Sequence, residues 1–220
     1  MLSFAQIDAQ YRDAIEAPGK DLTRAMDLAR KYPFNLTGSD INTSVLLKLK
    51  SFFLAQALIK KELNKVYASS AADFFVETIS FFLKVILETA LPLHTVASEK
   101  NLVNKRGAMR PDISVWKGEE IVVAIECKTQ LGWNRDGWLD EFLEREQRLH
   151  KINPNAKLFL LVMTASNWSG FGTDNRAGNQ FFVLLNTIWP DAFESDETNS
   201  GHIVHRVEDL FKKIIEHANG

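Results

Sequence analysis

The chain has 220 residues, of which 45% are hydrophobic and 25% are charged, the balance of an ordinary soluble globular protein. Its formal net charge of −2 gives no global basic signature of nucleic-acid binding, although basic residues can still act locally. The N-terminus lacks a basic region followed by an apolar run, and no stretch approaches ~20 uninterrupted apolar residues, so we expect neither a signal peptide nor a membrane span. The single cysteine, Cys127, cannot form an internal disulfide, which suits a reducing compartment and favours the cytoplasm.

Residues 1 to 66 are expected to form a helical N-terminal extension. Apolar residues recur at helical spacing from Phe4 onward, and Pro18-Gly19 is expected to stop the first helix. A second helix would begin at Asp21, and a third would run from about Thr43 to Leu63. The lysines of the third helix are expected to form a mainly solvated face, with a phosphate-contacting role as the alternative.

Residues 67 to 220 alternate between helical and strand-like patterns, as expected of an α/β core. The continuous apolar run over residues 157–163 is typical of a central strand that is covered on both faces. The pattern therefore predicts a central mixed β-sheet flanked by helices. In chain order we expect a helix over 70–89, strands over 93–98, 110–116 and 121–128, a helix over 138–151, the strand over 157–163, a strand or a helix start over 180–185, and a helix over 207–217.

Two opposite charges end the strand expected over residues 121–128. Because side chains in a strand alternate between faces, Glu126 and Lys128 are neighbours on the same face. The segment over residues 117–120 has the composition of a tight turn, so the strands on either side of it should pair as an antiparallel hairpin. Asp112, at the start of the first strand, then lies near the two charges at the end of the second.

These residues carry a family resemblance. Pro111-Asp112, the 14 positions from Asp112 to Glu126, and Glu126-Cys127-Lys128 resemble the PD-(D/E)xK signature of the restriction-endonuclease-like nuclease superfamily. The resemblance covers roughly residues 71–165 and implies that Asp112, Glu126 and the backbone carbonyl of Cys127 bind Mg²⁺. It also implies that Lys128 polarises the scissile phosphate or helps to position and deprotonate the attacking water. The thiol of Cys127 points away from this face and is expected to be buried and inert.

Glu77 is a lone acid on the apolar helix expected over residues 70–89, and two explanations stay open. It can belong to a surface stripe that also carries Asp73 and Lys84, since these residues are one and two turns away. Alternatively it completes the metal site, because an acid on the helix before the first strand often does so in the superfamily. Asp73 or Glu88 could take its place.

Several further polar residues are expected near the site. Gln130 falls on the face of Glu126 and Lys128 if that strand continues, and Gln147 lies on the following helix. The polar loop over residues 169–179 either reads base edges through its side chains or is a plain connection. A site for a polyanionic substrate also needs cations at its rim. Six basic residues fall in the right segments: Arg106, Arg110, Arg135, Arg145, Arg148 and Lys151.

The sequence predicts a Mg²⁺-dependent endodeoxyribonuclease that hydrolyses phosphodiester bonds in DNA. Within that class, the first choice is a type II restriction endonuclease that acts as a homodimer. We expect DNA as its partner and no association with a membrane. A DNA repair or recombination nuclease of the same fold is the alternative. A catalytically silent nucleic-acid-binding module on the same fold is a third hypothesis.

Overall fold

The computed structural model describes residues 3–130, 137–164, 174–186 and 203–220. The chain divides into two compact units, residues 1–34 and residues 35–220. We expected a boundary after residue 66. The division falls earlier because the second helix, α2 (Asp40–Glu62), packs against later helices of the larger unit.

The first unit is built on one long helix, α1 (Phe4–Ala29). Ser3 begins it with a capping box, in which its hydroxyl accepts from the Gln6 N–H and the Gln6 side chain accepts from the Ser3 N–H. The expected stop at Pro18-Gly19, and with it the separate second helix, is wrong. A proline removes one hydrogen bond and crowds the carbonyl four residues earlier, but its fixed φ is already helical, and α1 continues through it. The salt bridge from Lys20 to Glu16, at 2.8 Å, spans the proline on the helix surface.

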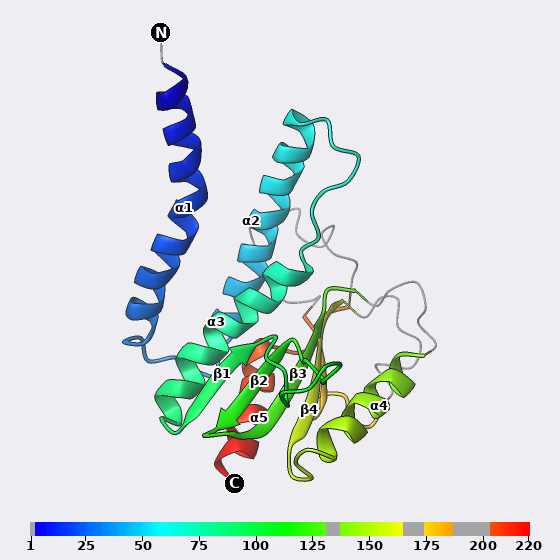
Figure 1. The fold of residues 1–220 in the computed structure, drawn as a ribbon. Helices are drawn as coiled ribbons and strands as arrows, with labels where there is room; N and C mark the ends of the chain where they lie inside the picture. The colour runs from blue at the N-terminus through cyan, green and yellow to red at the C-terminus, as the bar shows by residue number, and fades with distance from the viewer. Residues whose placement is uncertain (1–2, 131–136, 165–173, 187–202) are drawn as a thin grey trace. The chain divides into compact units, whose positions relative to one another are not determined.

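In the larger unit, a five-stranded sheet has the order β1-β2-β3-β4-β5 (Figure 1). The strands are β1 (His94–Ser98), β2 (Ile113–Lys117), β3 (Glu120–Lys128), β4 (Lys157–Thr164) and β5 (Phe181–Leu185). The pairs β1–β2 and β2–β3 are antiparallel, whereas β3–β4 and β4–β5 are parallel. The predicted α/β class with a mixed sheet flanked by helices is therefore confirmed, and the undecided segment near residue 180 is an edge strand.

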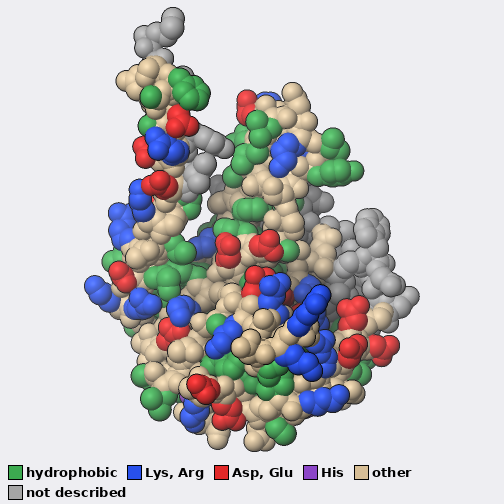
Figure 2. Space-filling model, in the orientation of Figure 1, with side chains coloured by type: hydrophobic (Ala, Val, Ile, Leu, Met, Phe, Trp, Pro, Cys, Tyr) green, Lys and Arg blue, Asp and Glu red, His purple; other side chains and the backbone are tan. Residues whose placement is uncertain are grey.

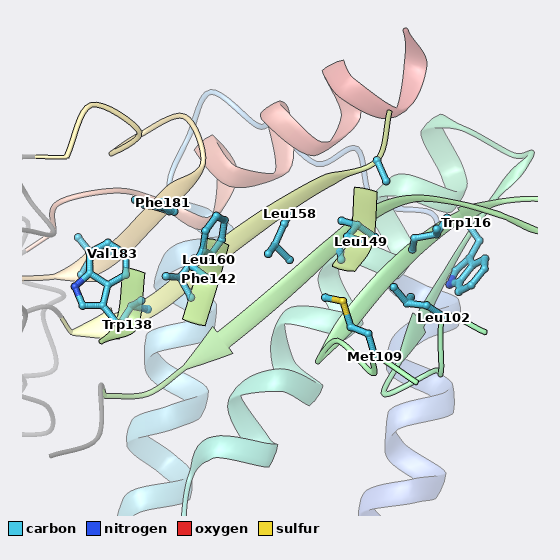
Figure 3. Close-up of a cluster of buried hydrophobic side chains, with 14 residues drawn as sticks. Leu102, Met109, Trp116, Trp138, Phe142, Leu149, Leu158, Leu160, Phe181 and Val183 are labelled. Atoms are coloured by element: carbon cyan, nitrogen blue, oxygen red, sulfur yellow. The ribbon is translucent and has the colours of Figure 1, made fainter. Parts of the chain in front are cut away.

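Helices cover both faces of this sheet. Helix α4 (Trp138–His150) lies on the near face in Figure 1, and α5 (Val207–Asn219) lies behind the sheet. Helix α3 (Ala72–Ala90) packs along β1 and also contacts β3. The core beneath α4 joins Phe142 and Leu149 of that helix to apolar side chains of the sheet (Figure 3). Strand β4 is buried along almost its whole length, as expected of a central strand.

Helices α2 and α5 cap each other's N-termini. Glu208 Oε1 accepts hydrogen bonds from the backbone N–H groups of Ile41 (2.7 Å) and Asn42 (3.2 Å), and Asn42 Oδ1 accepts from the Val207 N–H at 3.3 Å. The side chains of Asn42 and Glu208 are both fully buried. Because the first N–H groups of a helix have no partner within it, this exchange satisfies donors that the fold would otherwise bury unpaired. It explains why α2 begins at Asp40, three residues earlier than expected.

Replacing Glu208 should therefore destabilise the larger unit. We expect Glu208→Ala to lower the free energy of unfolding by about 1–3 kcal/mol, because it leaves two buried N–H donors unpaired. Urea titration followed by circular dichroism measures the change. The matched control is Glu216→Ala on the same helix, whose exposed surface pair should matter little. Equal stability of the two variants would contradict the capping role.

Candidate active site

The β2–β3 hairpin sets the positions of the charged residues. Ile113 pairs with Ile125, so Asp112, just before β2, lies opposite Glu126. The strands are joined through Gly118, whose φ of 61° is the positive value that the first position of a two-residue type II′ turn requires. The hairpin and its turn are thus as expected.

A β-bulge interrupts the hairpin and was not expected. Val115 pairs with Val123, but Trp116 pairs with Ile121, so Val122 is an extra residue in β3. The bulge shifts the alternation of side chains, and Ile121 joins Ala124 in the core beneath α4. Beyond the bulge the alternation is regular, which directs the Glu126 side chain to the same face.

Lys128 bridges the two carboxylates at the end of the hairpin. Its Nζ lies 3.2 Å from Asp112 Oδ2 and 3.4 Å from Glu126 Oε2. The backbone N–H of Cys127 also donates to Asp112 Oδ2, at 2.7 Å. Asp112 is therefore held by both the backbone and the side chain of β3. The structure brings together the three charged residues that the sequence placed at this point.

Arg145 of α4 completes the charge cluster. Its Nη1 lies 2.6 Å from Glu126 Oε1, and the Glu126 side chain is only 4% exposed. Arg145 was expected at the rim, as a phosphate contact. The sequence held a signal for the inward position, since Arg145 falls between the buried residues Phe142 and Leu149 at helical spacing. Its partner could not be inferred from that spacing.

Burial and neighbouring charges shift the acid–base properties of the cluster. Burial raises the pKa of Glu126; Arg145 and Lys128 oppose the shift but do not cancel it. Burial lowers the pKa of Lys128, yet the carboxylates of Asp112 and Glu126 outweigh this, so its pKa is raised overall. Burial raises the pKa of the Cys127 thiol well above its usual value, which makes it a poor nucleophile. Lys128 is accordingly a cation at neutral pH and acts as a hydrogen-bond donor.

A small hollow opens beside Glu126, between the end of β3, α4 and β4. Its volume is about 40 Å³, room for an ion or a few water molecules but not for a nucleotide. Charged side chains line it from two elements, and apolar ones complete the wall: Glu126, Lys128, Trp138, Glu141, Phe142, Arg145 and Leu160. A ligand larger than this would therefore contact the cluster from outside the hollow.

Glu77 lies on α3 with an exposed side chain. One turn later, Ser80 Oγ is 2.7 Å from Ser98 Oγ at the end of β1, and the next backbone N–H, of Glu99, donates to the Asp112 carbonyl at 3.1 Å. The Glu77 end of α3 therefore lies toward the Asp112 end of the sheet. Within the part of the chain that the structure describes, however, no three His, Cys, Asp or Glu side chains gather as a ready metal site.

The alternatives to Glu77 differ in position. Glu88 is committed elsewhere, because its carboxylate accepts from the Val96 N–H at 2.9 Å and forms a salt bridge with Lys84. Asp73 lies in the first turn of α3 and is exposed. Of these two acids, only Asp73 is left as an alternative to Glu77 at the metal site.

The other expected polar residues lie farther from the cluster. Strand β3 ends at Lys128, so the alternation that favoured Gln130 does not reach it, and Gln147 is on the exposed side of α4. Arg176 forms a salt bridge with Asp174 at 2.8 Å and lies over the ring of Phe181. These contacts support the interpretation of the loop over residues 169–179 as a plain connection rather than a loop that reads base edges. Arg135 and residues 169–173 lie outside the described residues.

Neither a protein-family model nor a curated protein matches the chain. Among solved structures, it is similar to a chain of one described as the native BbvCI A2B2 tetramer at low resolution, with 13% identity, a TM-score of 0.32 and coverage of 100% of this chain and 96% of that chain. A TM-score of this size does not establish a shared fold. Separately, none of the described helices has the length and apolarity needed to cross a bilayer.

Arg145 should control the titration of Glu126. Because Arg145 is the strongest influence that opposes burial, Arg145→Ala should raise the pKa of Glu126 further. Carboxyl ¹³C NMR across a pH titration measures it. Arg148→Ala is the matched control, since Arg148 lies on the same helix but donates to the Gly107 carbonyl instead. An unchanged Glu126 titration in Arg145→Ala would show that the ion pair does not form in solution.

Proposed function

We propose that the protein is a Mg²⁺-dependent endodeoxyribonuclease, most specifically a type II restriction endonuclease that acts as a homodimer. The observation that supports this is the pair of carboxylates, Asp112 and Glu126, that share the ammonium of Lys128 at the end of a buried hairpin. Such a cluster contributes little to a hydrophobic core, and its residue types match the PD-(D/E)xK signature that the sequence resembles.

The donor set fits a hard divalent cation. Two carboxylates already face one shared positive charge, and carboxylate and carbonyl oxygens are the ligands that Mg²⁺ prefers. Cys127 directs its N–H toward Asp112, and the N–H and C=O of one residue in an antiparallel ladder point toward the same neighbour. Its carbonyl is therefore on the correct side to join Asp112 and Glu126 as a ligand, with Glu77 as a further ligand from α3. When bound, Mg²⁺ would lower the pKa of a coordinated water and neutralise charge on the phosphate.

Lys128 and Arg145 have distinct roles in this proposal. Lys128 keeps its proton at Nζ and donates to a phosphate oxygen, stabilising the charge that develops there. Both oxygens of Glu126 are occupied, one by Arg145 and one by Lys128. Metal ligation by Glu126 would exchange one of these partners, and a released Arg145 guanidinium is suited to a bidentate contact with the same phosphate.

Cleavage of DNA tests the proposal directly. We expect the intact protein to cut plasmid DNA with Mg²⁺ or Mn²⁺ and to stop in EDTA. Asp112→Ala and Lys128→Ala should each reduce the rate by about 100-fold or more, because the first removes a metal ligand and the second removes a cation at the reacting phosphate. Lys117→Ala is the matched control, an exposed lysine at the opposite end of β2.

The product pattern distinguishes the two kinds of nuclease. Discrete plasmid fragments indicate a restriction endonuclease, whereas cutting confined to junctions, flaps or ends indicates a repair or recombination nuclease. No cutting with either metal would overturn the catalytic proposal. Metal-independent DNA binding would then favour the silent module.

Glu77 should contribute to metal affinity. We expect Glu77→Ala to weaken Mn²⁺ binding about tenfold, measured by calorimetry without DNA. Asp73→Ala tests the alternative acid on the same helix, and Glu119→Ala, at the distant hairpin turn, is the control. A loss in Asp73→Ala alone would transfer the role to that residue.

A further inference from the structure

The loop between β1 and β2, residues 99–112, is an ordered arm. The Leu102 N–H donates to the Met109 carbonyl at 2.9 Å, and both side chains are buried in the core beneath α4, beside Trp116 and Leu149 (Figure 3). Its tip reverses through the bond from the Ala108 N–H to the Lys105 carbonyl. The side chains at the tip are thus presented from a fixed base.

Basic residues dominate the exposed surface of this arm. Lys105 and Arg106 are exposed at the tip and Arg110 at the return. Arg148 of α4 donates to the Gly107 carbonyl at 3.3 Å, which places a further guanidinium against the tip, and Lys151 follows at the end of α4. We call the loop together with Arg148 and Lys151 the basic arm. Figure 2 shows Lys and Arg side chains gathered where the loop crosses the sheet.

The exposed cations of the basic arm form no salt bridge with the described residues. Within the described ranges of the chain, no carboxylate lies within salt-bridge distance of Lys105, Arg106, Arg110, Arg148 or Lys151. By contrast, Arg12 and Lys213 form surface ion pairs with Asp8 and Glu216. A net charge of −2 therefore conceals a local positive surface.

The basic arm is continuous with the charge cluster. Its loop ends at Asp112 itself, and the hydrogen bond from the Glu99 N–H to the Asp112 carbonyl closes its base. The return of the loop, from Arg110 to Asp112, therefore joins the basic arm to the end of the hairpin. The loop contains no aromatic residue, so it offers no platform for the stacking of unpaired bases.

We infer that the basic arm binds the phosphate backbone of duplex DNA next to the bond that is cut. This inference rests on the proposed nuclease function. Fixed, uncompensated cations bind phosphates independently of sequence and release counterions as they do so. The basic arm accordingly contributes affinity and positioning, while recognition of bases belongs to other residues.

Salt-dependent binding tests the inference without requiring cleavage. The full chain in EDTA is titrated with a fluorescent 30-base-pair duplex at several KCl concentrations. The slope of log K against log[salt] is negative, and the double variant Lys105→Ala/Arg106→Ala should make it less steep by about 2. Each lost phosphate contact removes about 0.9 from its magnitude. The single variant Arg110→Ala should lower it by about 1. Lys60→Ala/Lys61→Ala, which removes two exposed lysines of α2, is the matched control.

The outcomes separate this inference from the proposed function. If the double variant keeps the wild-type slope, the inference that the basic arm binds phosphates is overturned, even if the wild-type protein cuts DNA. If the double variant has a reduced slope but neither it nor the wild-type protein cuts DNA, the result supports phosphate binding by the basic arm and overturns the proposed nuclease function. Loss of binding to vesicles that contain phosphatidylserine, with unchanged binding to duplex DNA, assigns the surface to a membrane and overturns the inference. Equal loss in the control variant also overturns it, because the effect would then be unspecific.

Discussion

The shared salt bridges of Lys128 are the interaction on which the arrangement of the site depends. A buried carboxylate such as Glu126 is costly unless cations compensate it, and here Lys128 and Arg145 occupy both of its oxygens. Lys128 also holds Asp112, so one ammonium fixes the spacing of two groups from neighbouring strands. The two cations offset part of the cost of burial, and they hold together two carboxylates that would otherwise repel each other.

The sheet supplies the rigidity that this cluster requires. Strand β3 pairs with β2 on one side and β4 on the other, and the pairing with β4 continues to Lys128. The charged end of β3 is therefore held on the β4 side by a buried neighbour, while on the β2 side the carboxylate of Asp112 takes over from the backbone ladder. Backbone pairing thus gives way to side-chain pairing at this strand end, while the β4 side stays fixed.

Local patterns were sufficient to predict most elements and the central cluster. The apolar run of β4, the turn at Gly118 and the alternation that places Glu126 beside Lys128 are all short-range signals. The failures involve longer-range or cumulative effects. Pro18 was expected to end a helix because it removes a hydrogen bond and crowds the preceding turn, but this local cost does not outweigh the rest of α1.

Tertiary contacts account for what the sequence could not reveal. Glu208 caps α2 at Ile41, which is 167 residues away in the sequence, so no local pattern indicates where that helix begins. The bulge at Val122 depends on how two strands pair, and the ion pair between Arg145 and Glu126 depends on where α4 docks. In each case the residue type was visible, but its partner was set by packing between elements.

The charge asymmetry of α4 links the stability of the fold to the positive surface. Its first turn carries Asp140 and Glu141 and its last turn Arg148 and His150, an arrangement that complements the helix dipole. Because the C-terminal end of α4 lies against the tip of the loop over residues 99–112, the same preference that stabilises the helix delivers Arg148 to Gly107. A globally acidic chain can therefore build a local cationic surface without an excess of basic residues.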